Sequence, residues 1–209
     1  MDGDGDSDVL ITDRRGTERS IRWMENPAET QDSEQLVKPW TAHVIGKVRG
    51  DEPMFAALGD LNGDGRIDVV CPTVADPKAG RLIWYARNNG QNAWTEHLIK
   101  RPEGLQTRAK SVTLADVNQN GQTDILLTTG RYPGDAPGPS MLVWLEYETS
   151  PAETTWQRHE ISGPPGSKAD PVRMSDVDVD GDLDAVTTEQ EDKLRRHLVR
   201  EAGPQAEPR

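Results

Sequence analysis

Apolar residues in this chain occur in short runs, and each run ends at glycine, proline, asparagine or aspartate. Runs such as MFAALGD, IDVV and RLIWYAR contain many β-branched or aromatic residues, which is typical of strands. The chain also contains 19 Gly and 15 Pro, and these residues interrupt the pattern too often for long helices. The sequence therefore predicts an all-β protein.

One acidic segment occurs four times along the chain. The stretch DLNGDGRIDVV from Asp60 recurs as DVNQNGQTDILL from Asp116 and as DVDVDGDLDAV from Asp176, and MDGDGDSDVLIT at the start fits the same template without its first position. The last aspartates of the copies are separated by 60, 56 and 60 residues and are Asp8, Asp68, Asp124 and Asp184. Such a regular period indicates a repeat architecture.

Further strand patterns recur at fixed places in each repeat. A pattern precedes each complete acidic segment, as in MFAALGD, SVTLADV and VRMSDVD. After the first three segments comes a strand with a tryptophan, then a strand with a histidine. The tryptophans are Trp23, Trp84 and Trp144, and the histidines are His43, His97 and His159. Four short strands per period predict the blades of a β-propeller.

We expect residues 1–190 to form one domain of such blades, followed by a degenerate or disordered tail over 191–209. The predicted blades are 1–50, 51–105, 106–165 and an incomplete 166–199. The first blade lacks its innermost strand, and the last blade lacks its third strand. The segment KLRRHLV resembles the histidine strand of the other blades, with Leu194 in place of the tryptophan that begins that strand. Propellers close with four to eight blades, so three to three and a half blades predict a partial propeller whose open blade edges favour self-association.

The acidic segment has the composition of a cation-binding loop. Numbered from its first aspartate, positions 1, 3, 5 and 9 carry side-chain oxygens, position 6 is glycine and position 7 varies. Oxygen donors without imidazole or thiolate point to Ca²⁺, and the glycine permits the sharp turn that directs them inward. The predicted side-chain ligands are Asp60, Asn62, Asp64 and Asp68; Asp116, Asn118, Asn120 and Asp124; Asp176, Asp178, Asp180 and Asp184; and, in the truncated first loop, Asp2, Asp4 and Asp8. Arg66, Gln122 and Asp182 at position 7 would each contribute a backbone carbonyl.

Two other interpretations of these loops fit the sequence less well. An EF-hand would end in a bidentate glutamate at position 12, where this chain has Cys71, Leu127 or Thr187 inside a strand pattern. Simple hairpin turns also favour Asn, Asp and Gly, but they do not require oxygens at fixed offsets in four copies. Side-chain carboxylates number four, three and two in the loops that begin at Asp176, Asp60 and Asp116. This count predicts that Ca²⁺ leaves the Asp116 loop first on chelation.

Charge and hydropathy narrow the range of partners. The chain is 33% hydrophobic, its mean hydropathy is -0.76, and 24 Lys+Arg against 36 Asp+Glu give a net charge of -12. This charge has the wrong sign for a nucleic-acid backbone, and no apolar stretch approaches the roughly 18 residues that span a bilayer. We therefore expect neither a nucleic-acid partner nor a membrane span. The single cysteine, Cys71, is expected to be a small buried apolar residue.

The segments GDLNGDGRIDVV, ADVNQNGQTDILL and SDVDVDGDLDAV, together with the tryptophan and histidine strands, resemble the FG-GAP/VCBS repeat family. Calcium-binding β-propellers of this family include the integrin alpha-subunit head and many bacterial surface and secreted proteins. The resemblance covers nearly all of residues 1–190. It implies calcium in the hairpin between the first two strands of a blade and an extracellular or periplasmic location, although MDGDGDSD is unlike a signal peptide.

Two functions fit this sequence. The recurrence of the histidines favours a structural role, and neither GxSxG nor HExxH occurs. The first function is therefore a non-enzymatic, calcium-stabilised extracellular module for adhesion that binds a protein or a glycan. The alternative is part of a secreted calcium-dependent propeller enzyme, such as a lyase acting on polysaccharide. Arg108, Lys110 and Arg173 lie at or near innermost strands, where they would face a central channel.

Overall fold

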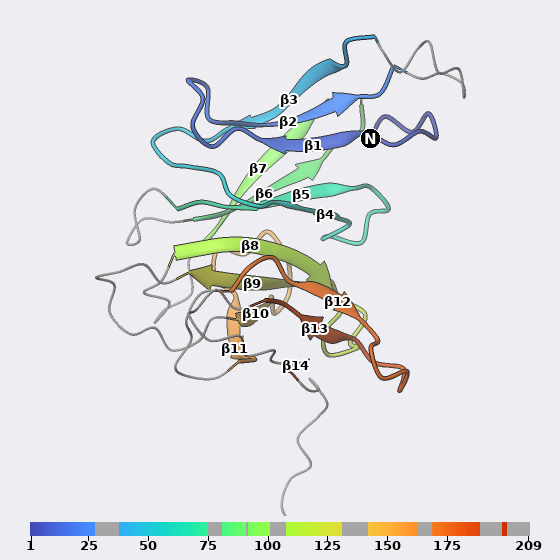
Figure 1. Cartoon of the computed structure of the whole chain (residues 1–209), viewed down its shortest axis with the longest axis vertical. Coiled ribbons are helices and arrows are strands. Elements are labelled where there is room, and N and C mark those ends of the chain that lie inside the picture. Colours follow the sequence, from blue (N-terminus) through green and yellow to red (C-terminus); the bar gives the residue numbers. More distant parts are fainter. Residues whose placement is uncertain are drawn as a thin grey trace, which may run out of the picture.

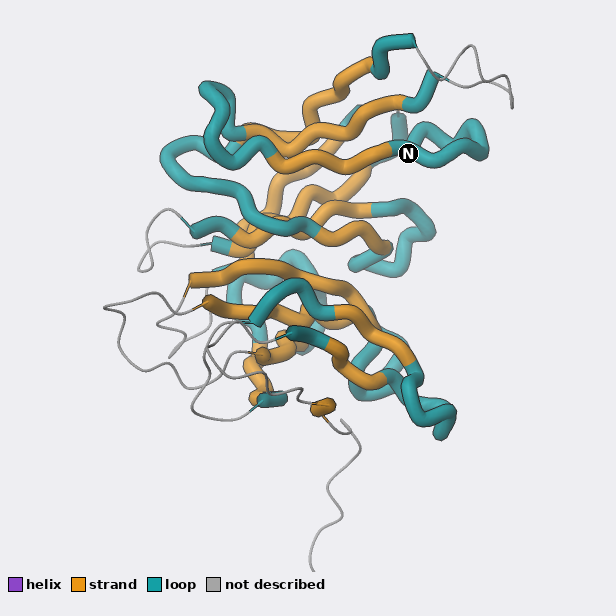
Figure 2. Tube along the Cα trace, viewed as in Figure 1, coloured by secondary structure: helices purple, strands orange, loops and turns teal. Residues whose placement is uncertain are grey.

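The computed structural model describes residues 1–27, 38–74, 81–90, 92–100, 108–130, 142–162 and 169–188, together with the backbone of 198–199. These residues form β-strands arranged in four antiparallel sheets, and they contain no helix (Figures 1 and 2). The all-β prediction is confirmed. Consequently, no helix in the described part of the chain has the length and apolar character needed to cross a membrane.

Each sheet is an antiparallel meander whose strands follow sequence order. Sheet 1 contains β1 (Val9–Thr12), β2 (Ser20–Glu25) and β3 (Thr41–Lys47). Sheet 2 contains β4 (Ala57–Gly59), β5 (Asp68–Pro72), β6 (Leu82–Arg87) and β7 (Trp94–Ile99). Sheet 3 contains β8 (Arg108–Ala115), β9 (Asp124–Gly130), β10 (Leu142–Glu146) and β11 (Gln157–Glu160). Sheet 4 contains β12 (Arg173–Ser175), β13 (Asp184–Val186) and β14 (Leu198–Val199).

Sheets 2 and 3 each contain the four strands of the predicted repeat, in the predicted order. Sheet 4 differs from the prediction. Because β14 pairs directly with β13, Leu198–Val199 occupies the place of a third strand and not that of a fourth. The described chain has no tryptophan strand between β13 and β14. The edge of β13 is therefore open, and β14 pairs with it. Apart from Leu198–Val199, the 191–209 tail lies outside the described residues, and this includes Leu194 and His197.

Consecutive sheets pack face to face, and the strand pleat explains how one sheet serves two cores. Val69 of β5 belongs to the core between sheets 1 and 2, whereas its neighbour Val70 belongs to the core between sheets 2 and 3. Neighbouring residues of a strand point to opposite faces of its sheet. The tryptophans Trp23, Trp84 and Trp144 are buried, one in each of the three cores. This confirms that the recurring tryptophans pack between sheets.

Sheet 1 lies at the top of Figure 1, sheet 2 lies below it, and sheets 3 and 4 together form the lower part of the molecule. Among the described residues, no backbone pairing joins sheet 4 to sheet 1. All four acidic segments lie on the same side of this series, at the right of Figure 1. They precede β1 or connect β4 to β5, β8 to β9 and β12 to β13. The fold thus presents the four loops in parallel at one rim.

Candidate metal centre

The glycine at position 6 shapes each acidic loop as predicted. Its φ is 81° at Gly65, 86° at Gly121 and 99° at Gly181, in the left-handed region that favours glycine. In each loop this glycine donates its N–H to Oδ2 of the aspartate at position 1. The distances are 2.7 Å to Asp60, 2.8 Å to Asp116 and 3.1 Å to Asp176. Three loops therefore share one hydrogen-bonded turn.

Position 4 also adopts a left-handed conformation, which the sequence did not reveal. Its φ is 74° at Gly63 but 57° at Gln119 and 64° at Val179. A β-branched residue with positive φ is a strained outlier, and the Val179 side chain is 85% exposed, so packing does not compensate for the strain. The presence of Gly3 and Gly63 at the same position was the available signal.

The aspartate at position 9 closes each loop from inside the sheet. It accepts the backbone N–H of position 2, at 3.2 Å for Leu61 to Asp68, 3.0 Å for Val117 to Asp124 and 2.9 Å for Val177 to Asp184. In the first loop, the amino group of Met1 pairs with Asp8 and takes the place of this N–H. Asp68 and Asp124 are fully buried and are the first residues of β5 and β9. Each side chain therefore ties the start of its loop to the start of the following strand.

The two fully buried aspartates have different surroundings. Asp68 also accepts hydrogen bonds from the Trp84 indole at 3.0 Å and from the Arg87 N–H at 2.8 Å. Among the described residues, no hydrogen-bond donor reaches Oδ1 of Asp124. Burial raises the pKa of Asp68, and burial together with repulsion from Glu146 and Asp116 raises the pKa of Asp124 to about 7. An unpartnered buried carboxylate oxygen facing other carboxylates fits a cation.

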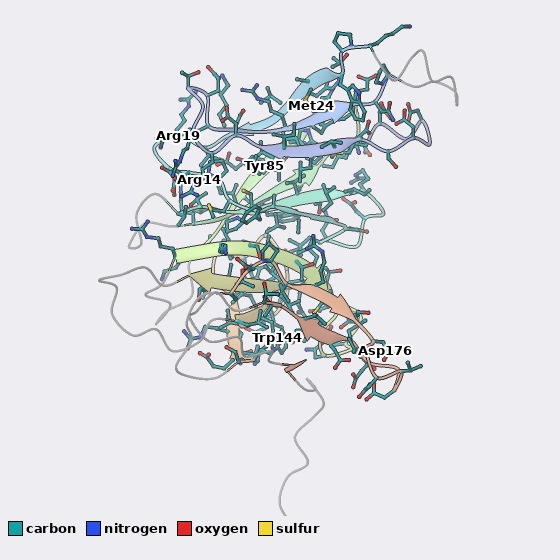
Figure 3. The ribbon with its side chains drawn as sticks, in the orientation of Figure 1. Arg14, Arg19, Met24, Tyr85, Trp144 and Asp176 are labelled. Atoms are coloured by element: carbon teal, nitrogen blue, oxygen red, sulfur yellow. The ribbon has the colours of Figure 1, made fainter. Side chains whose placement is uncertain are left out.

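The Asp176 loop brings its carboxylates closest together. One oxygen each from Asp176, Asp178 and Asp184 lies within 4.8 Å of the other two, and Figure 3 shows Asp176 in the loop beyond β12. Loss of hydration, followed by repulsion from Asp180 and Asp184, raises the pKa of Asp178. Within the described part of the chain, the remaining predicted ligand sets do not bring three carboxylates this close.

The Asp60 loop contains a side-chain cation of its own. Arg66 was predicted to offer a backbone carbonyl, but its guanidinium Nη2 also lies 2.5 Å from Oδ2 of Asp64. Its Nε donates to the Arg87 carbonyl at 2.9 Å, which fixes the side chain between the loop and β6. Asn62 donates its amide to the same Asp64 oxygen at 2.9 Å. The charge of Asp64 is therefore already partly neutralised.

The Asp116 loop receives a carboxylate that the sequence pattern missed. Glu146, at the end of β10, accepts the side-chain amides of Asn118 at 2.9 Å and Asn120 at 3.2 Å. Its other oxygen lies 3.0 Å from His159 Nε2. A sequence signal existed, because Glu25 stands at the same offset after Trp23 and lies 2.6 Å from His43 Nε2.

The first loop has the Asx turns of the others. Asp4 N–H donates to Asp2 Oδ1 at 3.2 Å, and Asp6 N–H donates to Asp4 Oδ1 at 3.1 Å. Both carboxylate oxygens of Asp6 are buried, and no hydrogen-bond partner for them lies in the described part of the chain. Asp2 and Asp4 thus shape the turn through backbone hydrogen bonds, whereas Asp8 accepts the backbone N–H of Asn26 at 3.0 Å.

The three recurring histidines stack on the three recurring tryptophans. Ring centroids lie 4.3 Å apart for Trp23 and His43, 4.4 Å for Trp84 and His97, and 4.0 Å for Trp144 and His159. Each pair is directly cross-strand in its sheet, where side chains face each other closely. Repetition of this packing pair explains the histidines structurally, as the sequence predicted.

The three cationic residues assigned to innermost strands lie on β8 and β12. Arg173 lines a pocket of about 180 Å³ together with residues of β1 and β8. Lys110 forms an ion pair with Asp170. The one cysteine, Cys71, is fully buried in the core between sheets 1 and 2, and burial raises the pKa of its thiol to about 12. This confirms its role as a small apolar residue.

Comparison with known proteins agrees with this repeat geometry. Residues 1–71 match the family model of the FG-GAP-like repeat, a range that contains sheet 1 and continues through the Asp60 loop into β5. No curated protein matches the chain. The matched range contains the acidic loop, the tryptophan strand and the histidine strand that recur in sheets 2 and 3. Residues 1–71 of this chain therefore contain an FG-GAP-like repeat.

Proposed function

We propose that this chain is a calcium-stabilised repeat module of an extracellular or periplasmic protein that binds a protein or a glycan and has no enzymatic activity. The observation that carries the proposal is the shared geometry of the loops at Asp60, Asp116 and Asp176, in which the same glycine bonds the same aspartate. Three loops of one shape at one rim support a common ligand. Their oxygen donors suit Ca²⁺, which accepts six to eight oxygens in loose geometry.

The donor set fits a divalent cation for electrostatic reasons. Asp176, Asp178 and Asp184 converge within 4.8 Å, and the Asp124 carboxylate is buried with one oxygen unpartnered. Like charges this close repel one another unless a cation lies among them. When bound, Ca²⁺ would neutralise these groups and hold each loop against the next strand. Its role in this proposal is therefore structural.

The side-chain contacts of Glu146 and Arg66 change the order of calcium affinity expected for the three loops. The ligand count from sequence placed the Asp116 loop last, with two carboxylates. Glu146 adds a third carboxylate to that loop, whereas Arg66 neutralises part of the charge of Asp64 in the Asp60 loop. Since affinity follows ligand charge in sites of one geometry, we expect the Asp176 loop to bind most tightly and the Asp60 loop to release Ca²⁺ first.

A calcium titration of chelator-stripped protein by calorimetry tests the proposal. We expect two or three ions per chain and a higher melting temperature in calcium than in chelator. The variants Asp176→Asn, Asp116→Asn and Asp60→Asn assign each binding step to a loop, and magnesium serves as the control ion. Failure of calcium to bind, or an unchanged melting temperature, would reduce the acidic loops to hairpin turns.

The packing of the described residues supports a binding module over the alternative polysaccharide lyase. The histidines that might act in catalysis are stacked on tryptophans, and two of them also pair with glutamates. We propose that the sheets are propeller blades, completed by further blades in the assembled protein. Glycan-array binding without turnover of the bound glycan is expected, and release of unsaturated sugars would establish the lyase instead.

A further inference from the structure

A polar pocket of about 440 Å³ lies between sheet 1 and sheet 2. Its volume falls within the range of about 300–1,000 Å³ that is usual for small-molecule sites. The lining combines three cationic side chains, one carboxylate and two aliphatic side chains. These residues are Lys47, Val48 and Arg49 at and after the end of β3, Ile83 of β6, Glu96 of β7, and Arg81, which directly precedes β6.

The pocket lies at a cationic end of an acidic protein. Residues 13–22 and 47–52 together contain six Arg or Lys and four Asp or Glu, whereas the whole chain has a net charge of -12. The two segments meet where the Arg19 carbonyl accepts the N–H of Val48 at 2.7 Å. Arg19 lies at the left of Figure 3, and Asp176 of the acidic rim lies at the right. Opposite charges are thus separated across the molecule, and an anion is attracted to the pocket end.

The cationic side chains of the pocket are only partly neutralised. Arg49 is exposed, and within the described part of the chain no partner reaches its guanidinium. Arg81 donates from Nη2 to the Arg49 carbonyl at 3.3 Å, while its Nε lies 3.7 Å from Oδ2 of Asp51, beyond hydrogen-bond length. Lys47 pairs with Glu18, but both side chains are 48% exposed, so this ion pair is weak. Positive charge therefore remains available to a ligand.

Close packing of the two sheets fixes the walls of the pocket. The Tyr85 ring lies so close to Gly46 that a Cβ added there would be 2.2 Å from Tyr85 Cε1. Tyr85 is buried in the core between sheets 1 and 2, and Glu96 lies directly opposite it in the pairing of β6 with β7. The contact holds residues 47–49 beside β6 and β7. The pocket is therefore formed before a ligand binds, which lowers the entropic cost of binding.

The chemistry of the lining favours a carboxylate that carries hydroxyl groups beside it. The guanidinium groups of Arg49 and Arg81 suit a carboxylate, to which arginine forms paired hydrogen bonds. The Glu96 carboxylate accepts hydrogen bonds from hydroxyl groups but repels a dianion such as phosphate. Val48 and Ile83 are almost fully buried and offer an aliphatic floor to the C–H face of a sugar ring. A sugar acid combines these three properties, whereas an acidic peptide lacks the neighbouring hydroxyl groups.

We propose that this pocket binds a sugar acid. Arg49 and Arg81 hold its carboxylate, Glu96 accepts its hydroxyl groups, and its ring lies over Val48 and Ile83. Two sources share this chemistry, a uronic acid unit of a polysaccharide and a free monosaccharide acid. The inference rests on the proposed function, since it names the ligand class of the binding module, but it requires no metal in the acidic loops.

The test is a nuclear magnetic resonance titration of the full chain with glucuronate, glucose and inorganic phosphate. Glucuronate should shift the amide signals of residues 47–49 and 81–83 and bind about tenfold more tightly than glucose or phosphate. Arg49→Gln should weaken glucuronate binding about tenfold. The matched variant Arg15→Gln removes the same charge from an exposed residue outside the pocket and should leave binding unchanged. Glu96→Gln should strengthen phosphate binding and weaken glucuronate binding, because it removes the repelling charge and the stronger acceptor.

A second arm distinguishes the two sources of the ligand. Tetragalacturonate that binds about tenfold more tightly than the monosaccharide would assign the pocket to a polysaccharide, since further units contact the cationic surface around it. Equal affinities would assign it to a free sugar acid. Because uronates bind Ca²⁺ themselves, both titrations are run in chelator. The calcium titration of the acidic loops is then a separate experiment.

Four results would overturn the sugar-acid site. These are the absence of glucuronate binding, binding without shifts in residues 47–49 and 81–83, equal losses in Arg49→Gln and Arg15→Gln, and tighter binding of a capped glutamate peptide, which would assign the pocket to an acidic protein segment. Such a failure leaves the proposed module standing if another glycan or a protein still binds elsewhere on it. Glucuronate binding by a chain whose acidic loops bind no calcium would instead refute only the calcium part of the proposed function.

Discussion

The aspartates at position 9 of two loops allow a direct test of the loop electrostatics. Replacing each of them with asparagine should change the stability of the protein in opposite directions. Asp68 and Asp124 are both fully buried. Asp68 accepts three hydrogen bonds, whereas Asp124 leaves Oδ1 without a partner. In chelator, Asp124→Asn should stabilise the protein because it removes a buried charge, and Asp68→Asn should destabilise it because an amide NH₂ would face a donor.

The structure sets the size of both effects. A pKa raised from 3.8 to about 7 at Asp124 corresponds to roughly 4 kcal/mol at neutral pH. Screening by the solvent near the loop reduces the expected gain from Asp124→Asn to about 2 kcal/mol. Leaving a buried donor of Trp84 or Arg87 unsatisfied costs about 1–3 kcal/mol, which is the expected loss for Asp68→Asn.

The assay is chemical denaturation of the parent and both variants in chelator and in calcium. The raised folded-state pKa means that the unfolded carboxyl ionises first. The advantage of Asp124→Asn should therefore be absent below about pH 4 and grow as the pH rises toward 7. In calcium the advantage should shrink or reverse, since the variant lacks an ionised ligand. Equal stabilities in chelator, or shifts of the same sign for both variants, would refute this account.

Three further predictions concern the loops and the cores. Val179→Gly should raise the free energy of unfolding by about 0.5–1 kcal/mol in thermal melts, because it relieves a left-handed β-branched residue; the control Val177→Gly should lower it, and a loss in both would contradict the strain. Glu146→Gln should weaken calcium binding at the Asp116 loop about tenfold in a titration, while Glu25→Gln, which removes the matching partner of His43, should leave that step unchanged; equal effects would show that Glu146 acts only through its histidine. Trp84→Ala should cost about 3–5 kcal/mol in denaturant, because the indole fills the core between sheets 2 and 3 and donates to Asp68; a loss below about 1 kcal/mol would contradict that packing.

The repeat could be predicted from the sequence alone because the signals that define it are local. Strand alternation and turn composition act over a few residues, so the strands of sheets 2 and 3 and the loops between their first two strands followed from the order of residue types. The glycine at position 6 was identified for the same reason, since its positive φ is a property of the turn itself. The FG-GAP resemblance rested on these local segments, and the family match over residues 1–71 agrees with it.

Tertiary structure decided what each loop can bind. Glu146 reaches the Asp116 loop from β10, and Arg66 fixes itself between the Asp60 loop and β6, so neither contribution follows from spacing within a loop. The contrast between Asp68 and Asp124 depends on whether an indole and a strand N–H reach the same buried carboxylate. Pairing of β14 with β13 depends on which edge is open. These features arise where segments distant in sequence meet, and electrostatic and packing energies there depend on distances that no local pattern fixes.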